Sequence, residues 1–474
     1  MAGNESASPV EPGSQGAPVQ IALTASVAAI GGFLFGFDTA VINGAVGPVQ
    51  AVFHANPFTI GLAVSAALLG SALGAVVAGR IADRIGRIRV MIIAAVLFLV
   101  QSFGVGLAFS LVDFSIWRFV GGVAVGAASV IAPAYIAEIA PARLRGRLGS
   151  LQQLAIVVGI FVAALVDLAI AAAAGGADKT WLLGLPAWRW MFLSEVIPSL
   201  IYLIGALQIP ESPRYLVARG KLDEAQKVLV NIVGRANVSA KVEEILSTLS
   251  TEHRPRFGDL FGGRAGLLPL VWVGIALSVF QQFVGINVIF YYSSVLWQAV
   301  GFSEQNALLI TTITNLTNIV TTLVAISIID RLGRKPLLLI GSAGMTVMLG
   351  GLAVLFGSAP LDASHQPILQ GINGPLALLA ANLYVFAFGM SWGPVVWVLL
   401  GEMFPNRIRA AALGLAAGMQ WIANFVVSTT FPTLSSVSLA LAYGIYATMA
   451  LLSFVFVWSE VRETKGRELE SMRA

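Results

Sequence analysis

The sequence predicts an all-α membrane protein of twelve spanning helices, arranged as two six-helix halves with pseudo-two-fold symmetry. Hydrophobic residues make up 57% of the 474 residues and charged residues only 11%, whereas a soluble chain carries about 25% charged residues. Twelve segments are long and apolar enough to cross a bilayer, which takes about 20 residues. Charged motifs also recur at matching spacing in the two halves of the chain. So much apolar surface cannot be buried in one soluble core, so lipid must be the solvent for much of it.

The expected organisation is six spans, a polar linker, and six further spans. Residues 1–19 are polar and carry no Lys or Arg, which argues against a cleavable signal peptide and favours a disordered tail. Residues 210–266 carry amphipathic patterns that predict short helices, and residues 460–474 form a second tail. The expected spans are 20–47, 59–82, 88–110, 114–139, 147–174, 188–209, 267–299, 304–330, 336–357, 375–403, 408–433 and 438–459, which places the two bundles at 20–209 and 267–459.

The placement of Lys and Arg predicts the orientation, because basic loops stay in the cytosol. Of the 28 basic residues, all but Arg118, Lys179 and Arg189 lie in the even-numbered connections or in the C-terminal tail. We therefore expect a multi-pass protein of the cell membrane with both termini in the cytosol.

Several classes of protein are disfavoured by composition. The chain has no Cys, which excludes disulfides, thiolate metal sites and Cys nucleophiles. Its three His are far apart in the sequence, so no metal site is expected. The spans contain no His–carboxylate cluster or nucleophile–base pair, so we expect no catalytic residues, no enzyme activity and no cofactor. The sequence shows no charged ring of the kind that lines a channel, so a channel is not expected. We expect no nucleic-acid partner, and we expect the protein to be a monomer.

Two charged motifs occur once in each half. The first reads GRIADRIGR at 79–87 and DRLGRK at 330–335, so that Asp83, Arg84, Gly86 and Arg87 match Asp330, Arg331, Gly333 and Arg334. In the second, Glu138 and Glu402 precede a Pro and two Arg by the same intervals, and those residues are Pro141, Arg143 and Arg145 in one half and Pro405, Arg407 and Arg409 in the other. Two related halves place a binding site at their interface near the midplane.

These charges sit at the cytosolic edges of the spans. Paired across helix ends, they can clamp the cytosolic side shut, with Glu138 pairing with Arg143 and Arg145. The alternative is that they are topology signals and solvated pairs, worth about 0–1 kcal/mol each. Their recurrence in both halves favours a gate.

Amides and aromatic residues interrupt several apolar spans. They are Gln153, Gln281, Gln282, Asn287, Asn318, Gln420 and Asn424, with Trp397 and Trp421. An amide offers both a donor and an acceptor, as a sugar hydroxyl requires, and no fixed countercharge lies among these residues. On a helix Gln281 and Gln282 point about 100° apart, and Asn287 can share a cavity-facing surface with Gln282. The set predicts a neutral polyhydroxy ligand. The alternative is interhelical hydrogen bonding, worth about 0.6 kcal/mol on average, and Asn287 or Asn424 is expected to be partly structural.

Asp38 interrupts the first span, where a charge is costly and indicates function. Arg118 of the fourth span is its natural partner. Ionised Asp38 would pair with Arg118, and a proton would release the pair, which ties closure of the outer gate to proton binding. A permanent structural ion pair is the alternative, and Asp167 and Glu195 are the other carboxyls that could couple a proton.

With these motifs, the chain resembles the sugar porter family of the major facilitator superfamily, over roughly residues 20–470. The segments that carry the resemblance are GRIADRIGR at 79–87, YIAEIAPARLRGR at 135–147, PESPR at 210–214, QQFVGIN at 281–287, DRLGRKP at 330–336 and GEMFPNRIR at 401–409. The tail reads RETKG at 462–466, where the family has PETKG, so the local turn at Arg462 is in doubt. The PESPR segment adds Glu211 and Arg214 to the charges of the cytosolic gate.

The resemblance implies roles for individual residues. Family sugar contacts fall on Gln153, Gln281, Gln282, Asn287, Asn318, Trp397 and Gln420. Pocket walls fall on Phe35, Ile156, Ile160, Tyr291 and Trp421. At Ile160 the xylose symporter has a glutamine and a glucose facilitator an isoleucine, which favours a hexose. Proton-coupled members carry an aspartate at the position of Asp38, and animal facilitators an asparagine.

We therefore expect proton-coupled symport of a neutral monosaccharide, D-glucose first, by alternating access. An uncoupled facilitator of the same sugar, or a symporter of galactose, xylose or inositol, is the alternative.

Overall fold

The computed structural model describes residues 16–140, 145–233, 237–251, 257–263, 266–362, 366–405 and 408–464. Within these ranges, twelve helical segments are long and apolar enough to cross a membrane, which confirms the expected count of spans. Most of the tail expected over 1–19 lies outside the described residues, and the first helix begins at Gly16.

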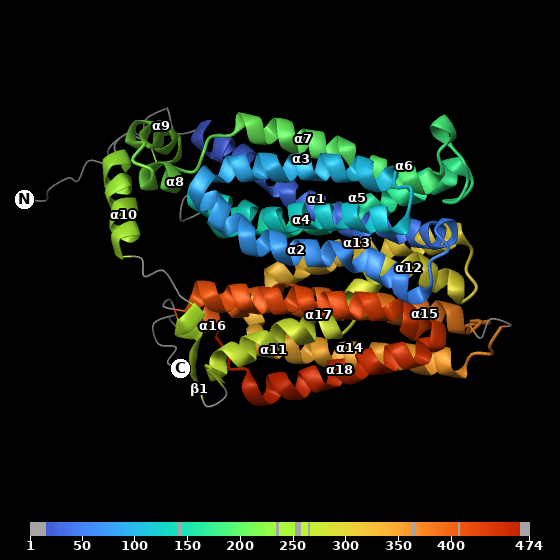
Figure 1. Cartoon of the computed structure of the whole chain (residues 1–474). Helices are drawn as coiled ribbons and strands as arrows, with labels where there is room; N and C mark the ends of the chain where they lie inside the picture. The colour runs from blue at the N-terminus through green and yellow to red at the C-terminus, as the bar shows by residue number, and fades with distance from the viewer. Residues whose placement is uncertain are drawn as a thin grey trace, which may run out of the picture.

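The first six spans form one bundle, drawn in blue to green in Figure 1. The sixth span consists of two helices, α6 and α7, and a short 3-10 turn (η2) precedes it. The bounds are α1 Gly16–Val52, α2 Pro57–Ile85, α3 Arg87–Gly106, α4 Leu111–Ile139, α5 Arg145–Ala174, η2 Leu182–Gly184, α6 Ala187–Leu193 and α7 Val196–Gln208.

The linker forms short helices that lie beyond one end of the bundles (Figure 1). We call that end the linker end and the opposite one the far end. The linker elements are α8 Pro213–Ala218, α9 Leu222–Val233, α10 Val238–Thr251, η4 Phe257–Leu260 and a two-stranded antiparallel ribbon, β1 Phe261–Gly263 and β2 Gly266–Leu267.

The last six spans form the second bundle, beside the first (Figure 1). The seventh and tenth spans each consist of two helices. The bounds are α11 Pro269–Phe283, α12 Ile286–Ala299, α13 Glu304–Leu332, α14 Arg334–Ser358, α15 Asn373–Gly389, α16 Trp392–Met403, α17 Arg409–Val437 and α18 Leu439–Glu460. Between the halves, α1 packs on α12, α2 on α17 and α5 on α13.

Four helices that start at the far end are capped by the side chain just before them. The caps are Asn56, Ser110, Ser303 and Ser438, each of which accepts a hydrogen bond from a backbone amide three residues further on. Such caps satisfy one of the backbone amides that a helix start leaves without a partner. The turns at the far end are therefore specified locally by the sequence.

Glycines bring α2 and α4 into backbone contact. A Cβ at Gly70 or Gly74 of α2 would meet backbone atoms of α4, and a Cβ at Gly122 or Gly126 of α4 would meet backbone atoms of α2. This is the close approach that small residues permit between membrane helices. The two helices interlock along this face.

Candidate functional site

A buried ion pair joins α1 to α4. Arg118 Nη1 donates to Asp38 Oδ1 at 2.7 Å and to the Asp38 carbonyl at 3.2 Å. Both side chains are almost fully shielded from solvent. A charge in the interior of a membrane protein requires such a partner, and the structure brings together the two residues that the sequence marked.

A second buried carboxyl, Glu195, lies at the break between α6 and α7. Gln101 Nε2 donates to Glu195 Oε2 at 2.6 Å and to Asp38 Oδ1 at 3.2 Å, so one amide nitrogen links the two carboxyls. Ser102 Oγ lies 3.4 Å from the same Glu195 oxygen. Gln101 was not among the residues predicted from the sequence. Its signal is that of an amide inside an otherwise apolar span.

The seventh span is broken between its amides, which corrects the view of one continuous helical surface. The helix ends at Phe283 and restarts at Ile286, with Gly285 at φ 83° between them. Glycine adopts this left-handed conformation without steric cost. The break lets Asn287 Nδ2 donate directly to Gln282 Oε1. The two amides therefore meet because of the break and not because of helical spacing.

Gln281 is partly engaged in holding the fold. Its Nε2 donates to the carbonyls of Trp392 at 2.8 Å and Gly393 at 3.2 Å. Those residues begin α16, just after the break in the tenth span. The donor of Gln281 is thus already used by the chain, and its Oε1 has only a distant contact, 3.5 Å from Gln282 Nε2.

The remaining expected sugar contacts are distributed over four helices. Gln153 of α5 is half-buried and Asn318 of α13 is buried, beside Gly389. Trp397 of α16 is 44% exposed. Gln420 Oε1 of α17 is buried and has no hydrogen-bond partner among the described residues. An unsatisfied buried acceptor is costly, so Gln420 is suited to accept from a ligand hydroxyl.

The expected pocket walls come from both halves. The rings of Phe35 and Trp421 lie 5.9 Å apart, tilted by 45°, and so connect α1 with α17. Tyr291 and Ile160 are buried, and Ile156 is half-buried against the core of the bundle. The structure thus places aromatic faces at the interface of the halves.

At the linker end, a charge cluster of the first half joins three helices and the linker. Arg87 donates to both carboxylate oxygens of Glu138, at 3.0 and 3.1 Å, and lies 3.1 Å from Asp83. Glu211 accepts from the backbone amides of Arg87 and Ile88, at 3.0 and 3.3 Å. Glu211 therefore caps the start of α3.

The second half repeats this cluster. Arg334 donates to both oxygens of Glu402, at 2.7 and 3.0 Å. Glu463 accepts from the backbone amides of Arg334 and Lys335, each at 3.0 Å. Glu463 is thus the counterpart of Glu211, and it was not among the residues predicted from the sequence. The available signal was that PESPR and RETKG both place a Glu before Ser or Thr. The unusual Arg462 leaves this contact in place.

Each of the two ion pairs lies within its own half of the chain. The described partner of Glu138 is Arg87, and the pairing expected with Arg143 and Arg145 lies outside the described residues. Of the other expected gate residues, Arg84 lies in the last turn of α2, Arg331 lies in the last turn of α13, and Arg214 lies in α8. Residues outside the described part are Arg143 and Arg407, together with the side chains of Arg145, Asp330 and Arg409.

Hydrogen bonds between the halves gather toward the far end. Asn43 Nδ2 donates to the Phe290 carbonyl at 2.9 Å, and Asn43 Oδ1 accepts from the Ser294 amide at 2.9 Å. The hydroxyls of Ser65 and Thr429 lie 2.6 Å apart, which joins α2 to α17. These contacts close the far end between the bundles.

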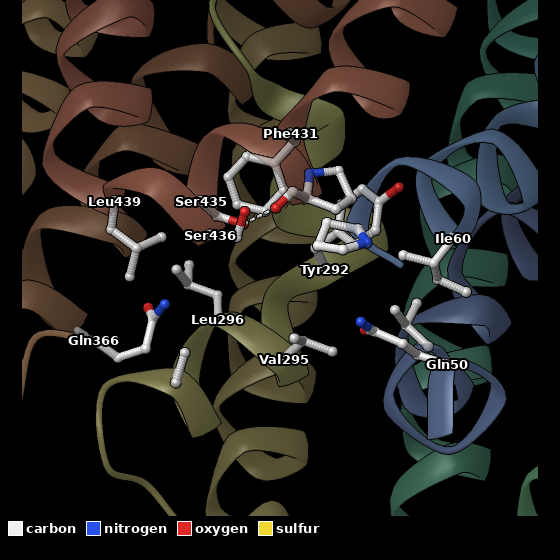
Figure 2. Close-up of a pocket in the computed structure, with 14 residues that line it drawn as sticks. Gln50, Ile60, Tyr292, Val295, Leu296, Gln366, Phe431, Ser435, Ser436 and Leu439 are labelled. Carbon is white, nitrogen blue, oxygen red and sulfur yellow. Dashed lines mark hydrogen bonds between the residues drawn. The ribbon is translucent and has the colours of Figure 1, made fainter. Parts of the chain in front are cut away.

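A cavity of about 160 Å³ lies at this closure (Figure 2). It is mostly apolar, and Figure 2 shows Gln50 and Ile60 on the first half facing Val295, Leu296 and Phe431 on the second. None of the expected sugar contacts lines it. The cavity therefore lies at the closed far end, apart from the expected sugar contacts.

Comparisons with known proteins agree with this arrangement. The chain is 62% identical, over 95% of its length and 97% of the relative, to a glucose transport protein of Synechocystis sp.. It is 40% identical to the D-xylose-proton symporter of Escherichia coli, over 94% of each chain. The inward-open structure of the E. coli xylose transporter XylE superposes with a TM-score of 0.81 at 38% identity, covering 94% of this chain and 98% of that one.

Twelve spans in two halves, with a charge cluster repeated in each half, define a transporter of the major facilitator superfamily. The sugar (and other) transporter family model matches residues 24–474, and the chain belongs to that family.

Proposed function

We propose that this protein carries a neutral monosaccharide, D-glucose first, into the cell together with a proton, by alternating access. The observation that carries the proposal is the Asp38–Arg118 pair, a protonatable carboxyl buried in the bundle with one guanidinium partner. The relatives named for glucose transport and for xylose–proton symport support both the sugar and the coupling.

The linker end faces the cytosol in this proposal, since the basic connections lie there and basic loops stay inside. Both termini are then cytosolic. The far end is the outer side, so the contacts of Asn43 make up a closed outer gate. The conformation is the one that receives or releases sugar on the cytosolic side, and the protein acts as a monomer.

The sugar lies between the halves against the amides of the second half. Gln282, Asn287 and Gln420 offer donors and acceptors to its hydroxyls. Trp397 and the Phe35–Trp421 contact offer apolar faces to the ring. Gln281 contributes its oxygen while its nitrogen holds α16.

The proton acts on the Asp38–Arg118 pair. Ionised Asp38 attracts Arg118, and a proton on the carboxylate removes that attraction, so the relation of α1 to α4 depends on proton binding. The Glu195 carboxyl contacts the same amide as Asp38, so loss of the charge on one carboxyl changes the electrostatic field at the other. Because outer-gate residues such as Asn43 lie on the same helix as Asp38, a proton can thereby favour gate closure.

The charge clusters at the linker end form the inner gate. In the present conformation, each ion pair holds helices of one half together. We propose that on closure of the cytosolic side the same clusters meet across the halves with the neighbouring basic loops.

The test is sugar uptake into proteoliposomes with an imposed pH gradient, measured for glucose, galactose, xylose and inositol. A symporter concentrates its sugar against a gradient and gives sugar-dependent inward currents. Equilibration without accumulation would instead identify a facilitator, and accumulation of another sugar would reassign the substrate.

A further inference from the structure

A third buried carboxyl, Asp167 of α5, takes no part in the coupling pair. Its side chain is 1% exposed. Oδ2 accepts from the backbone amide of Gly44 at 3.2 Å, and Oδ1 has no hydrogen-bond partner among the described residues. Gly44 makes room for this contact, because a Cβ there would lie 2.8 Å from Asp167 Oδ2.

Asp167 lies directly behind the closed outer gate. Gly44 follows Asn43, the residue that fastens α1 to α12. At about 1.5 Å per residue, Gly44 is about 12 Å from the end of α1 at Val52, and Asp38 is about 9 Å deeper. Thus Asp167 lies between the outer surface and the coupling pair.

No charged partner compensates Asp167 in the described part of the chain. The helices packed on α5 are α1, α4, α6 and α13. Their ionisable residues are Asp38, Asp113, Arg118, Tyr135, Glu138, Arg189, Glu304, Asp330 and Arg331. Within the described part, Asp38 is held by Arg118, Arg189 donates to the Gly106 carbonyl, and Glu304 accepts from the Ala177 amide. Tyr291 and Tyr292 are the ionisable residues of the neighbouring α12.

We propose that Asp167 is a second proton-binding site, which takes up a proton from outside as the outer gate closes and returns it outside when the gate reopens. An ionised carboxylate with an unsatisfied oxygen is costly in a membrane interior, so closure favours the neutral acid. Opening the gate hydrates the carboxylate and releases the proton.

The consequence differs from that of Asp38. In the present conformation, in which the outer gate is closed, Asp167 is still buried, and that burial leaves its proton no path to the cytosol. Its proton therefore sets how the outer gate responds to external pH and adds nothing to the number of protons carried with each sugar. This inference rests on the orientation given under the proposed function.

Cysteine labelling tests the proposal, because the chain has no Cys of its own. Val46 is 2% exposed and lines the outer cavity, so a Val46→Cys thiol reports gate opening to an impermeant maleimide added outside. Phe109, 83% exposed in the α3–α4 connection, supplies the control: Phe109→Cys corrects for the pH dependence of the thiol itself.

The comparison is made in the Asp38→Asn background, which removes titration of the coupling pair. Labelling of Val46→Cys should rise from acidic to alkaline external pH in this background. Adding Asp167→Asn or Asp167→Ser should abolish that rise and leave labelling low. A flat profile with Asp167 intact, or a rise that persists without it, would overturn the proposal.

Uphill uptake separates this inference from the proposed function. The single variant Asp167→Asn should still concentrate sugar with a proton gradient, at an unchanged proton-to-sugar ratio. Loss of accumulation in Asp167→Asn, with sugar exchange intact, would assign Asp167 to coupling and contradict its role as a gate sensor. Symport itself is judged separately, by accumulation in the unmodified protein.

Discussion

A single nitrogen of Arg118 donates to two acceptors of Asp38, the carboxylate at 2.7 Å and the backbone carbonyl at 3.2 Å. Only the first of these contacts depends on the charge of the carboxylate. Protonation of Asp38 should therefore weaken the tether between α1 and α4 without severing it. Arg118 stays close enough to recapture the carboxylate when the proton leaves.

We predict that Asp38→Asn abolishes uphill sugar accumulation driven by a proton gradient but spares sugar exchange. Asparagine keeps an oxygen that can accept from Arg118 and Gln101, so the packing should persist while the titration is lost. Radiolabelled glucose uptake and counterflow in proteoliposomes measure the two activities. Asp178→Asn, at an exposed far-end position, is the matched control and should behave as the unmodified protein. Concentration of sugar by Asp38→Asn would place coupling at another carboxyl.

We predict that Gln420→Ala lowers only the affinity for sugar, whereas Gln281→Ala lowers both the affinity and the stability of the protein. Loss of one hydrogen bond to sugar costs about 1–3 kcal/mol, or roughly 5–150-fold in affinity. Gln420→Ala should show this loss with unchanged thermal stability, because no described residue donates to its oxygen. Gln281→Ala should also lower the unfolding temperature, because it removes the side-chain hydrogen bonds that tie α11 to the start of α16. Binding by calorimetry and unfolding in detergent separate the two, and equal stability of both variants would contradict the distinction.

We predict that Glu138→Gln and Glu402→Gln shift the protein toward the cytosol-open state. Each removes a carboxylate on which closure of the inner gate depends in our proposal. Outer labelling of the Val46→Cys thiol should then fall. Glu224→Gln on the exposed surface of the linker is the control. Increased or unchanged outer labelling in both gate variants would show that these charges do not close the cytosolic side.

We predict that Glu463→Ala destabilises the second half by about 1–2 kcal/mol, the cost of losing a helix cap. The substitution leaves the first two amides of α14 without their acceptor. Thermal unfolding in detergent and protease sensitivity of the C-terminal tail measure the effect. Glu460→Ala, at the exposed end of α18, should change neither. A Glu463→Ala variant as stable as the unmodified protein would show that this contact does not stabilise the second half.

Composition and span length were enough to predict the twelve helices, because lipid imposes a uniform demand on each of them. The pairing of Asp38 with Arg118 could also be predicted, since two charges in apolar spans have few other partners. The sequence did not predict that the carboxyl of Glu195 and the amide of Gln101 lie next to that pair. Their contact depends on how α3 and α6 pack on α1, which spacing along the chain does not encode.

The breaks in the spans were the main feature missed. Gly285 of the seventh span is one of 49 glycines in the chain, and the sequence does not show that its φ is left-handed. The hydrophobic pattern runs across the break, so the span was expected to be one helix. For the same reason the contact between Gln282 and Asn287 was attributed to a helical face.

The glycine contact between α2 and α4 has a mechanical consequence. Each backbone fits against the other with no side chain between them, so neither helix can slide or roll without collision. The two helices should move as one rigid unit during transport. The bending that opens one side and closes the other must then occur in other helices. The interrupted spans, six, seven and ten, offer the joints at which it can occur.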